Sequence, residues 1–373
     1  MSDEMNAGSV PLPPPLPDAA ASPSVSTSEV AKPHKRRPRY SGNHPRRFEE
    51  KYKEHNPERY EATVAKVLAS GKTPAGMHRP IMVDEILEVL GPKPGDVAAD
   101  CTLGYGGHAE AMLARLLPGG KLLGLDVDPL ELPRTEARLR VLGYSEDVFQ
   151  VRRSNFAGLP QVIAQAGLDA VDVVLADLGV SSMQIDDPSR GFSVKLRGPL
   201  DMRMNPQRGQ PASVLLERMS ASALAGILAE CSDEPRAEEI AAGVAGRAFT
   251  TTTELANAVL AAVPKVRDPD ERALTVRRVF QAVRIVVNDE FSALETFLRQ
   301  LPFCLRPGGR VAVLTFHSGE DRRVKKAFQA GAREGVYSDV ARDVVRASEA
   351  EQRSNPRSAP AKLRWAIKAR PEV

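Results

Sequence analysis

The feature of this sequence that most constrains its fold is one strand–turn–helix–strand unit that ends at Asp126. A short apolar run ends at Asp100, the glycine turn Gly104-Tyr-Gly-Gly107 follows, residues 109–117 have helical spacing, and a second apolar run ends at Asp126. Glycine allows a tight turn and a close approach of the backbone to a ligand. Asp126 lies 22 positions after Gly104, where a doubly wound α/β fold places the carboxylate that binds a ribose. The unit predicts a nucleotide-type ligand site, and a purely structural turn is the alternative.

The spacing of these glycines argues against one class of enzyme. Dinucleotide-binding sites carry the pattern Gly-x-Gly-x-x-Gly, whereas this turn reads Gly-x-Gly-Gly. The missing third glycine disfavours a nicotinamide-dependent dehydrogenase.

Length and cysteine usage set further bounds. A chain of 373 residues has room for about two domains. Its three cysteines, Cys101, Cys231 and Cys304, show neither metal-ligand nor disulfide spacing, so we expect no metal site and a reducing, cytoplasmic location. No apolar run approaches the ~20 residues of a membrane span, and the N-terminus lacks the pattern of a signal peptide. We therefore expect no membrane partner.

The formal net charge of the whole chain is only +3, so basic character has to be sought locally. It is concentrated near the N-terminus. Residues 1–31 are rich in Pro, Ala and Ser, which predicts a disordered tail. Residues 32–77 form a basic extension, with nine Lys or Arg against two acids between Lys32 and Lys53. Tyr40, Phe48 and Tyr52 lie among these cations. Because cations neutralise phosphates and aromatic rings stack on bases, the extension predicts contact with nucleic acid, and a solubilising tail is the alternative. A short helix is expected at 56–70.

Further strands follow the first unit. Residues 148–152 predict a short strand, just before Phe156, and residues 171–177 predict a buried parallel strand that ends at Asp177. A carboxylate at this end of a central strand points into the crevice where open α/β sheets bind ligands. A helix-capping role for Asp177 is the alternative, but acids at three strand ends (Asp100, Asp126 and Asp177) favour the ligand site. Phe156 could lie against an adenine, although its spacing alone favours a core aromatic.

Residues 186–288 interrupt the alternation of strands and helices. They predict helices at Ser213–Ala229, Arg236–Ala248, Glu254–Val263 and Asp270–Asn288, the third with the capping box Thr251-Thr-Thr-Glu254. We interpret 186–288 as an inserted helical substrate-recognition domain between a first part (78–185) and a second part (289–373) of the catalytic domain. In the second part we expect a helix at 291–305, a strand at 310–316, a mobile loop at 331–354 and a final edge strand at 362–367.

Several polar residues in these later regions are candidates for substrate contact. Phosphate contact is a reasonable role for some of the arginines in the insertion, and a solvated helix face is the alternative. These arginines are Arg203, Arg272, Arg277, Arg278 and Arg284. His317 and Ser318 follow the strand at 310–316 on the crevice side. His317 could titrate near neutrality, although a histidine after a strand is more often a structural donor.

A set of longer motifs carries a family resemblance across residues 78–370. The motifs are Asp100-Cys-Thr-Leu-Gly-Tyr-Gly-Gly-His108, Asp126-Val-Asp-Pro129, Asp177-Leu-Gly-Val-Ser-Ser-Met-Gln184, Arg190-Gly-Phe192, Gly198-Pro-Leu-Asp-Met-Arg-Met204, Phe280-Gln-Ala-Val-Arg-Ile285, Phe316-His-Ser318, Glu320-Asp-Arg322 and Asn355-Pro-Arg357. The chain resembles the small-subunit (16S) ribosomal RNA cytosine-N4 methyltransferase family. The resemblance implies the α/β class I S-adenosylmethionine-dependent methyltransferase fold, a Rossmann-like sheet with an inserted helical domain.

The resemblance also implies roles for individual residues. Gly106, Gly107 and His108 would line the methionine end of S-adenosyl-L-methionine, Asp126 would hold its ribose, Phe156 would border its adenine, and Asp177 and Gln184 would complete the cofactor site. Four positions depart from the family pattern: Met183 stands where proline is usual, Gly319 replaces leucine, and Ala359-Pro360 replaces Arg-Ser.

The implied reaction is methylation of the exocyclic N4 of a specific cytosine in 16S ribosomal RNA of the small ribosomal subunit. Asp177, or a backbone carbonyl within 178–182, would serve as hydrogen-bond acceptor for the amine protons, and the base would have to leave its stack. Two alternatives stay open: a non-catalytic RNA-binding factor for ribosome assembly, and an amino methyltransferase that acts on DNA or protein. The sequence leaves a monomer and a homodimer equally open.

Overall fold

The computed structural model describes residues 80–371. The expected disordered tail, the basic extension with its three aromatic residues and the helix at 56–70 lie outside these residues. Within residues 80–371, every helix is too short or too polar to span a bilayer.

One seven-stranded sheet organises the structure, with the strand order β3-β2-β1-β4-β5-β7-β6. The strands are β1 Val97–Asp100, β2 Lys121–Asp126, β3 Phe149–Arg153, β4 Val171–Asp177, β5 Leu305–Thr315, β6 Tyr337–Val340 and β7 Lys362–Lys368. Strands β1 to β5 pair in parallel, and β7 runs antiparallel to both β5 and β6. The predicted Rossmann-like α/β fold is confirmed.

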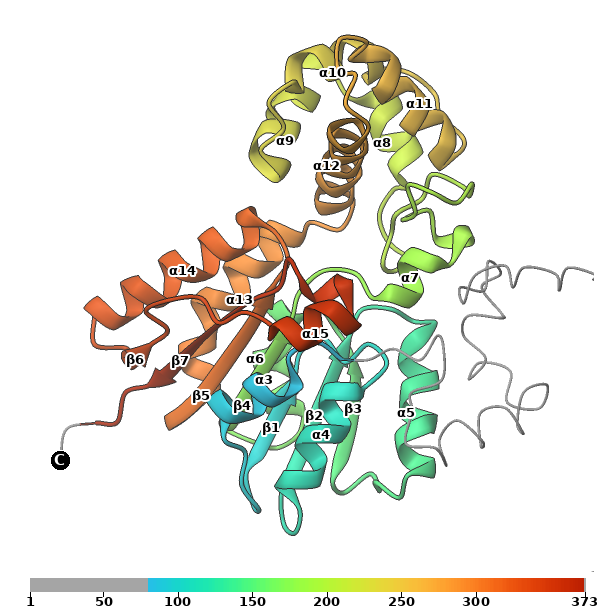
Figure 1. Cartoon of the computed structure of the whole chain (residues 1–373). Coiled ribbons are helices and arrows are strands. Elements are labelled where there is room, and N and C mark those ends of the chain that lie inside the picture. Colours follow the sequence, from blue (N-terminus) through green and yellow to red (C-terminus); the bar gives the residue numbers. More distant parts are fainter. Residues whose placement is uncertain (1–79, 372–373) are drawn as a thin grey trace, which may run out of the picture. The chain divides into compact units, whose positions relative to one another are not determined.

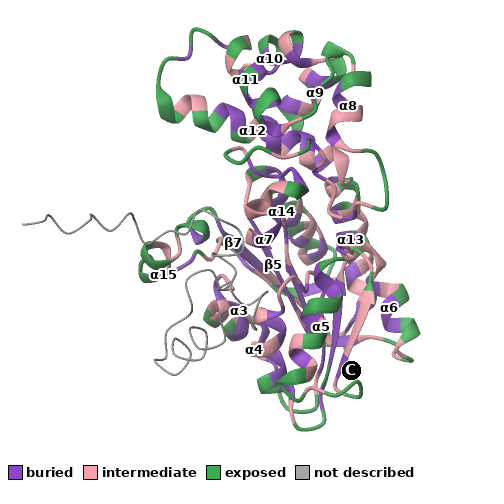
Figure 2. Cartoon of the chain, turned by 90° about the vertical axis from the view of Figure 1, so that its right-hand side faces the viewer, coloured by how far each residue is buried: buried purple, intermediate pink, exposed green. Residues whose placement is uncertain are grey.

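Helices cover both faces of this sheet, which explains why its strands are nearly continuous in apolar residues. Helices α3 (Val83–Leu90), α4 (Gly107–Leu116) and α5 (Glu131–Val141) share one hydrophobic cluster with Ala98 of β1. Helices α6 (Leu159–Gln165), α13 (Glu290–Cys304) and α14 (Ser318–Arg333) share another with Val97 and Ala99. The two clusters alternate along β1 because successive side chains of a strand point to opposite faces. The central strands are accordingly buried (Figure 2).

A third hydrophobic cluster belongs to the helical region that follows β4 (Figure 1). Its helices are α8 Ala212–Arg218, α9 Ala221–Ser232, α10 Ala237–Val244, α11 Thr252–Ala262 and α12 Pro269–Val287, preceded by the short α7 Ser182–Asp186. The predicted capping box of α11 is present, with Glu254 N–H bonded to Thr251 Oγ1. The boundaries of a recognition domain at 186 and 288 stay a prediction.

Three sequence predictions for this region and the C-terminal part were wrong. The single helix expected at Ser213–Ala229 is two helices, because Ser220 is extended and its side chain caps α9 at Ala223 N–H. The expected mobile loop at 331–354 contains β6 and α15 (Glu349–Ser354). As a consequence, β7 is not an edge strand but lies between β5 and β6.

The helical region and the sheet are joined by polar contacts as well as by chain connections. Asp233 caps the C-terminal end of α9 with a left-handed backbone, φ 51°. Its carboxylate accepts hydrogen bonds from Ser318 Oγ at 2.5 Å and Arg322 Nη2 at 3.2 Å, both on α14. The end of α9 is therefore fastened to the helix that follows β5.

Candidate active site

The candidate site is a cleft of about 1270 Å³ where β1, β2, β4 and β5 end. Its lining includes the glycine turn, Asp126, Phe156, Asp177 and, from α12, Arg284. Pockets for one small ligand have typical volumes of roughly 300–1,000 Å³. This cleft therefore has room for a nucleotide-sized ligand and a second group beside it.

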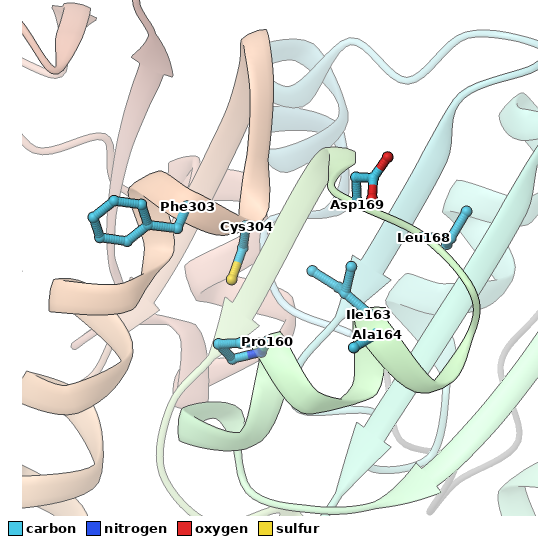
Figure 3. Close-up of a pocket in the computed structure, with 7 residues that line it drawn as sticks. All are labelled: Pro160, Ile163, Ala164, Leu168, Asp169, Phe303 and Cys304. Carbon is cyan, nitrogen blue, oxygen red and sulfur yellow. The ribbon is translucent and has the colours of Figure 1, made fainter.

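A second, smaller cavity of about 230 Å³ lies at the other end of the strands, where β4 and β5 begin (Figure 3). Its lining comes from α6, the loop before β4 and the end of α13, and includes Asp169, Phe303 and Cys304. None of the predicted site residues lies there, so the large cleft is the candidate.

The glycine turn is held closely by α5. A Cβ on Gly106, which has φ +81°, would lie 2.8 Å from Thr135 Cγ2, and one on Gly107 would lie 2.8 Å from Pro80 Cγ. Thr135 Oγ1 donates to Gly104 O at 2.5 Å. Gly106 caps α4, whose first backbone N–H groups have no partner within the helix. Such groups bind anions, so the turn suits the carboxylate of an amino-acid moiety.

Asp126 is bonded directly to the turn that its spacing predicted. Its two oxygens accept Gly104 N–H at 2.7 Å and Asp128 N–H at 2.9 Å. Burial raises the pKa of Asp126 above its usual value, although these two hydrogen bonds oppose the rise. Each carboxylate oxygen has two lone pairs, so each can still accept a hydrogen bond from a ribose hydroxyl group.

Phe156 begins the 3₁₀ turn Phe156–Gly158, just after β3. Its half-buried ring lines the cleft and lies 5.6 Å from the ring of Phe297, edge to face. The structure thus gives it features of both predicted roles, a core contact and a wall of the cleft.

Gln184 belongs to a buried network that sequence reasoning missed. Its Nε2 donates to Asp128 Oδ2 at 2.8 Å, and Arg190 Nη1 donates to the same oxygen at 2.7 Å. Gln184 also forms a capping box with Ser181. That Ser-x-x-Gln pattern is a signal visible in the sequence, but nothing in the sequence pairs Asp128 with Arg190. The network joins the end of β2 to the loop after α7.

Asp177 and His108 face each other in the floor of the cleft. Burial, together with the charges of Asp100 and Glu320, raises the pKa of Asp177 to about 8. His108 Nε2 lies 2.9 Å from Ile81 O, and because a carbonyl only accepts, Nε2 carries the proton. His108 Nδ1 is then 3.7 Å from Asp177 Oδ2, and burial lowers the pKa of this imidazole. A neutral ring therefore faces a carboxyl group that holds its proton near neutral pH.

Asp100 is a third acid beneath this rim. Burial raises its pKa to about 7, and the charge of Asp126 adds to the rise while hydrogen bonding to Thr102 opposes it. Within the described chain its Oδ2 has no hydrogen-bond partner. Buried polar groups are rarely left unpaired, so this oxygen departs from the usual pattern.

Three of the five candidate arginines, Arg203, Arg278 and Arg284, are paired with acids. Arg203 forms two hydrogen bonds to Asp201, at 2.8 and 2.7 Å. Arg284 forms two to Glu290, both at 2.8 Å, and Arg278 lies 3.8 Å from Glu234 Oε2. Of the three, only Arg284 lines the cleft. The sequence could not show this, since acids are frequent near any arginine.

His317 and Ser318 also have structural contacts. His317 caps α14 through its side chain, and its Nε2 lies 3.1 Å from Glu320 Oε1. It lines the cleft, whereas Ser318, bonded to Asp233, does not. The geometry gives His317 a structural role, but as an acceptor: its Nδ1 accepts the Glu320 N–H at 3.4 Å.

Comparison with known proteins identifies the family. The model of the MraW methylase family matches residues 75–369. The "Ribosomal RNA small subunit methyltransferase H 1" of Lachnoclostridium phytofermentans is 50% identical, over 90% of this chain and 93% of its own length. The protein of the same name from Agathobacter rectalis is 47% identical over 91% and 99%, and the "methyltransferase H 2" of Alkaliphilus metalliredigens is 50% identical over 90% and 97%. Because the family match covers residues 75–369, which include every residue that lines the cleft, the chain belongs to the MraW methylase family.

Proposed function

We propose that the chain transfers a methyl group from S-adenosyl-L-methionine to the exocyclic N4 of a cytosine in 16S ribosomal RNA of the small ribosomal subunit. One observation carries the proposal: a single cleft contains both the nucleotide-type acids and glycines and the inner side of the helical region. The names of the relatives, ribosomal RNA small subunit methyltransferases, support the same substrate. The proposed place of action is the cytoplasm, as a monomer or a homodimer.

The residues of the rim fit the donor part by part. Asp126 offers acceptors for two ribose hydroxyls, Phe156 offers an aromatic surface for an adenine, and the start of α4 offers N–H groups for a carboxylate. His108, Asp177 and Gln184 enclose the remaining space. When bound, S-adenosylmethionine supplies a methyl group that its positive sulfur has already made electrophilic.

The acceptor needs more help from the protein. The lone pair of the N4 amine is conjugated into the ring, so the amine is a weak nucleophile and must be held in line with the methyl carbon. We assign the amine proton to Asp177, whose carboxyl group lies in the floor of the cleft. A cation held nearby lowers the pKa of a carboxyl group, which would leave Asp177 ionised and able to accept.

The RNA must present its base singly. A base inside a duplex does not reach a buried floor, so the target nucleotide has to leave its stack. Single-stranded and looped RNA does so at least cost. The proposed recognition domain, 186–288, supplies α12 as one wall of the space that would receive it.

The test is methyl transfer with labelled S-adenosylmethionine. The chain is incubated separately with immature small subunits, mature small subunits, naked 16S RNA, DNA and protein, and the RNA is digested for mass spectrometry of its nucleosides. We expect N4-methylcytidine in ribosomal RNA. RNA binding without transfer would instead support the assembly factor, and label in DNA or protein would support the other alternative.

A further inference from the structure

The basic side chains that line the cleft fall into two groups. Arg284 and Arg357 are ion-paired, with Glu290 and Asp186. Lys195, Arg208 and Arg277 also line the cleft, and no side-chain partner for them exists within residues 80–371. All three are exposed. Three positive charges are therefore available to a ligand.

These cations come from three separate segments whose backbones are fixed. Lys195 is in a turn closed by Ser193 Oγ, which accepts the N–H groups of Lys195 and Leu196 at 3.2 and 3.1 Å. Arg208 is in a turn built on the buried Asn205, whose Oδ1 accepts Gln207 N–H at 3.0 Å. Arg277 is on α12. The three segments therefore bring these cations to one cleft from different parts of the chain's sequence.

The acids of the cleft have the opposite distribution. Asp126, Asp128, Glu131, Asp177, Asp186, Glu290 and Glu320 are buried or half-buried, and among the cleft-lining acids of residues 80–371 only Asp289 is exposed. Acidic side chains thus lie in the floor, and unpaired basic side chains lie at the exposed surface. A nucleotide has the complementary polarity, since its phosphates are anionic and the amino group of cytosine donates hydrogen bonds.

We propose that Lys195, Arg208 and Arg277 form a phosphate clamp, which holds the RNA backbone on both sides of the target nucleotide while its base enters the floor. This inference rests on the proposed function for the identity of the strand. The clamp positions the RNA without reading its sequence, because phosphate contacts carry no base information.

The test compares two triple variants of the full chain. Lys195→Ala/Arg208→Ala/Arg277→Ala removes the clamp, and Lys93→Ala/Lys325→Ala/Lys326→Ala removes three exposed cations that do not line the cleft. Binding to unmodified 16S RNA transcript is measured by filter retention over a range of salt. Each phosphate contact on a single strand contributes about 0.7 to the slope of log affinity against log salt. We expect the clamp variant to lose about 2 from this slope and the control variant to lose less than 0.7.

Methyl transfer then separates the clamp from the proposed function. With the clamp variant we expect a KM for RNA raised about tenfold or more, an unchanged kcat at saturating RNA and an unchanged affinity for S-adenosylmethionine by calorimetry. An unaltered salt slope, or an equal change in the control, overturns the clamp even if the wild-type chain methylates RNA. If the clamp substitutions reduce the salt slope but the wild-type chain transfers no methyl group, the clamp is kept and the proposed function is rejected.

Discussion

The rim of the sheet and the helical region differ in whether their charged side chains have partners. In the helical region Arg203 pairs with Asp201, and Arg284 with Glu290 at its junction with α13. At the rim Asp100, Asp126 and Asp177 have no Lys or Arg partner within the described residues, and their pKa values rise because they are buried. A buried charge without a partner is costly and tends to be neutralised by a proton. Internal pairing therefore marks structure here, and missing pairing marks the place where a ligand supplies the partner.

The largest effect should come from breaking a paired site. Arg284→Met leaves the Glu290 carboxylate without its cation, and loss of one partner from a buried pair costs about 3–5 kcal/mol. The free energy of unfolding, measured in urea, should fall by this amount. Arg284→Met with Glu290→Leu should recover most of it, because both charges are gone. A double variant as unstable as the single one would mean that the pair is not what stabilises this junction.

At the rim, the largest effect should be on binding. Asp126→Ala removes the proposed ribose acceptor, so affinity for S-adenosylmethionine should fall at least about 100-fold, or about 2.8 kcal/mol, by calorimetry. The matched control is Asp172→Ala, which removes an acid of β4 that is bonded to Arg306 instead. It should change the affinity less than about twofold. Retained affinity in Asp126→Ala would refute the ribose assignment.

An unpaired acid should also be visible in the pH dependence of the reaction. The pKa of Asp177 is about 8, and only its ionised form accepts a proton. We expect kcat/KM for S-adenosylmethionine to fall about tenfold for each pH unit well below 8, since this ratio reports the enzyme before that cation is bound. Asp177→Asn should lose methyl transfer at every pH. Undiminished turnover in that variant would remove Asp177 from the mechanism.

The smallest effect should be a gain in stability, on Asp177→Asn, whereas Arg284→Met should lose stability. The pKa of Asp177 rises from 3.8 to about 8 on folding, so the folded state binds more protons between these values and stability falls as pH rises. Asp177→Asn removes this penalty. Its melting temperature should exceed that of the wild type by a few degrees at pH 8, and the difference should shrink toward pH 5. A difference independent of pH would contradict the assigned titration.

The comparison also explains which parts of the molecule could be predicted from sequence. Strand ends were predictable because apolar runs stop at Asp100, Asp126 and Asp177, and parallel strands bring their ends to one edge. The contacts of Asp128 were not, because its partners Gln184 and Arg190 lie 56 and 62 positions away.

Charge pairing and strand order were also beyond local reasoning. Sequence shows that an arginine is present but not whether it forms an ion pair with an acid of the same chain. Arg203 and Arg278 form such pairs and are poor candidates for substrate contact, whereas Arg277 lines the cleft and is a better one. Strand β6 was missed because it is short and its two central residues, Ser338 and Asp339, are exposed.

The position of β7 has a consequence for how the molecule is completed during synthesis. Strand β6 pairs with β7 and with no other strand of the described sheet, yet β7 follows it by more than twenty residues. A nascent chain that has emerged only as far as β6 has nothing to dock that strand against. Premature termination just before Lys362 would accordingly cost the sheet two strands rather than one, and would expose the flank of β5 that β7 normally covers.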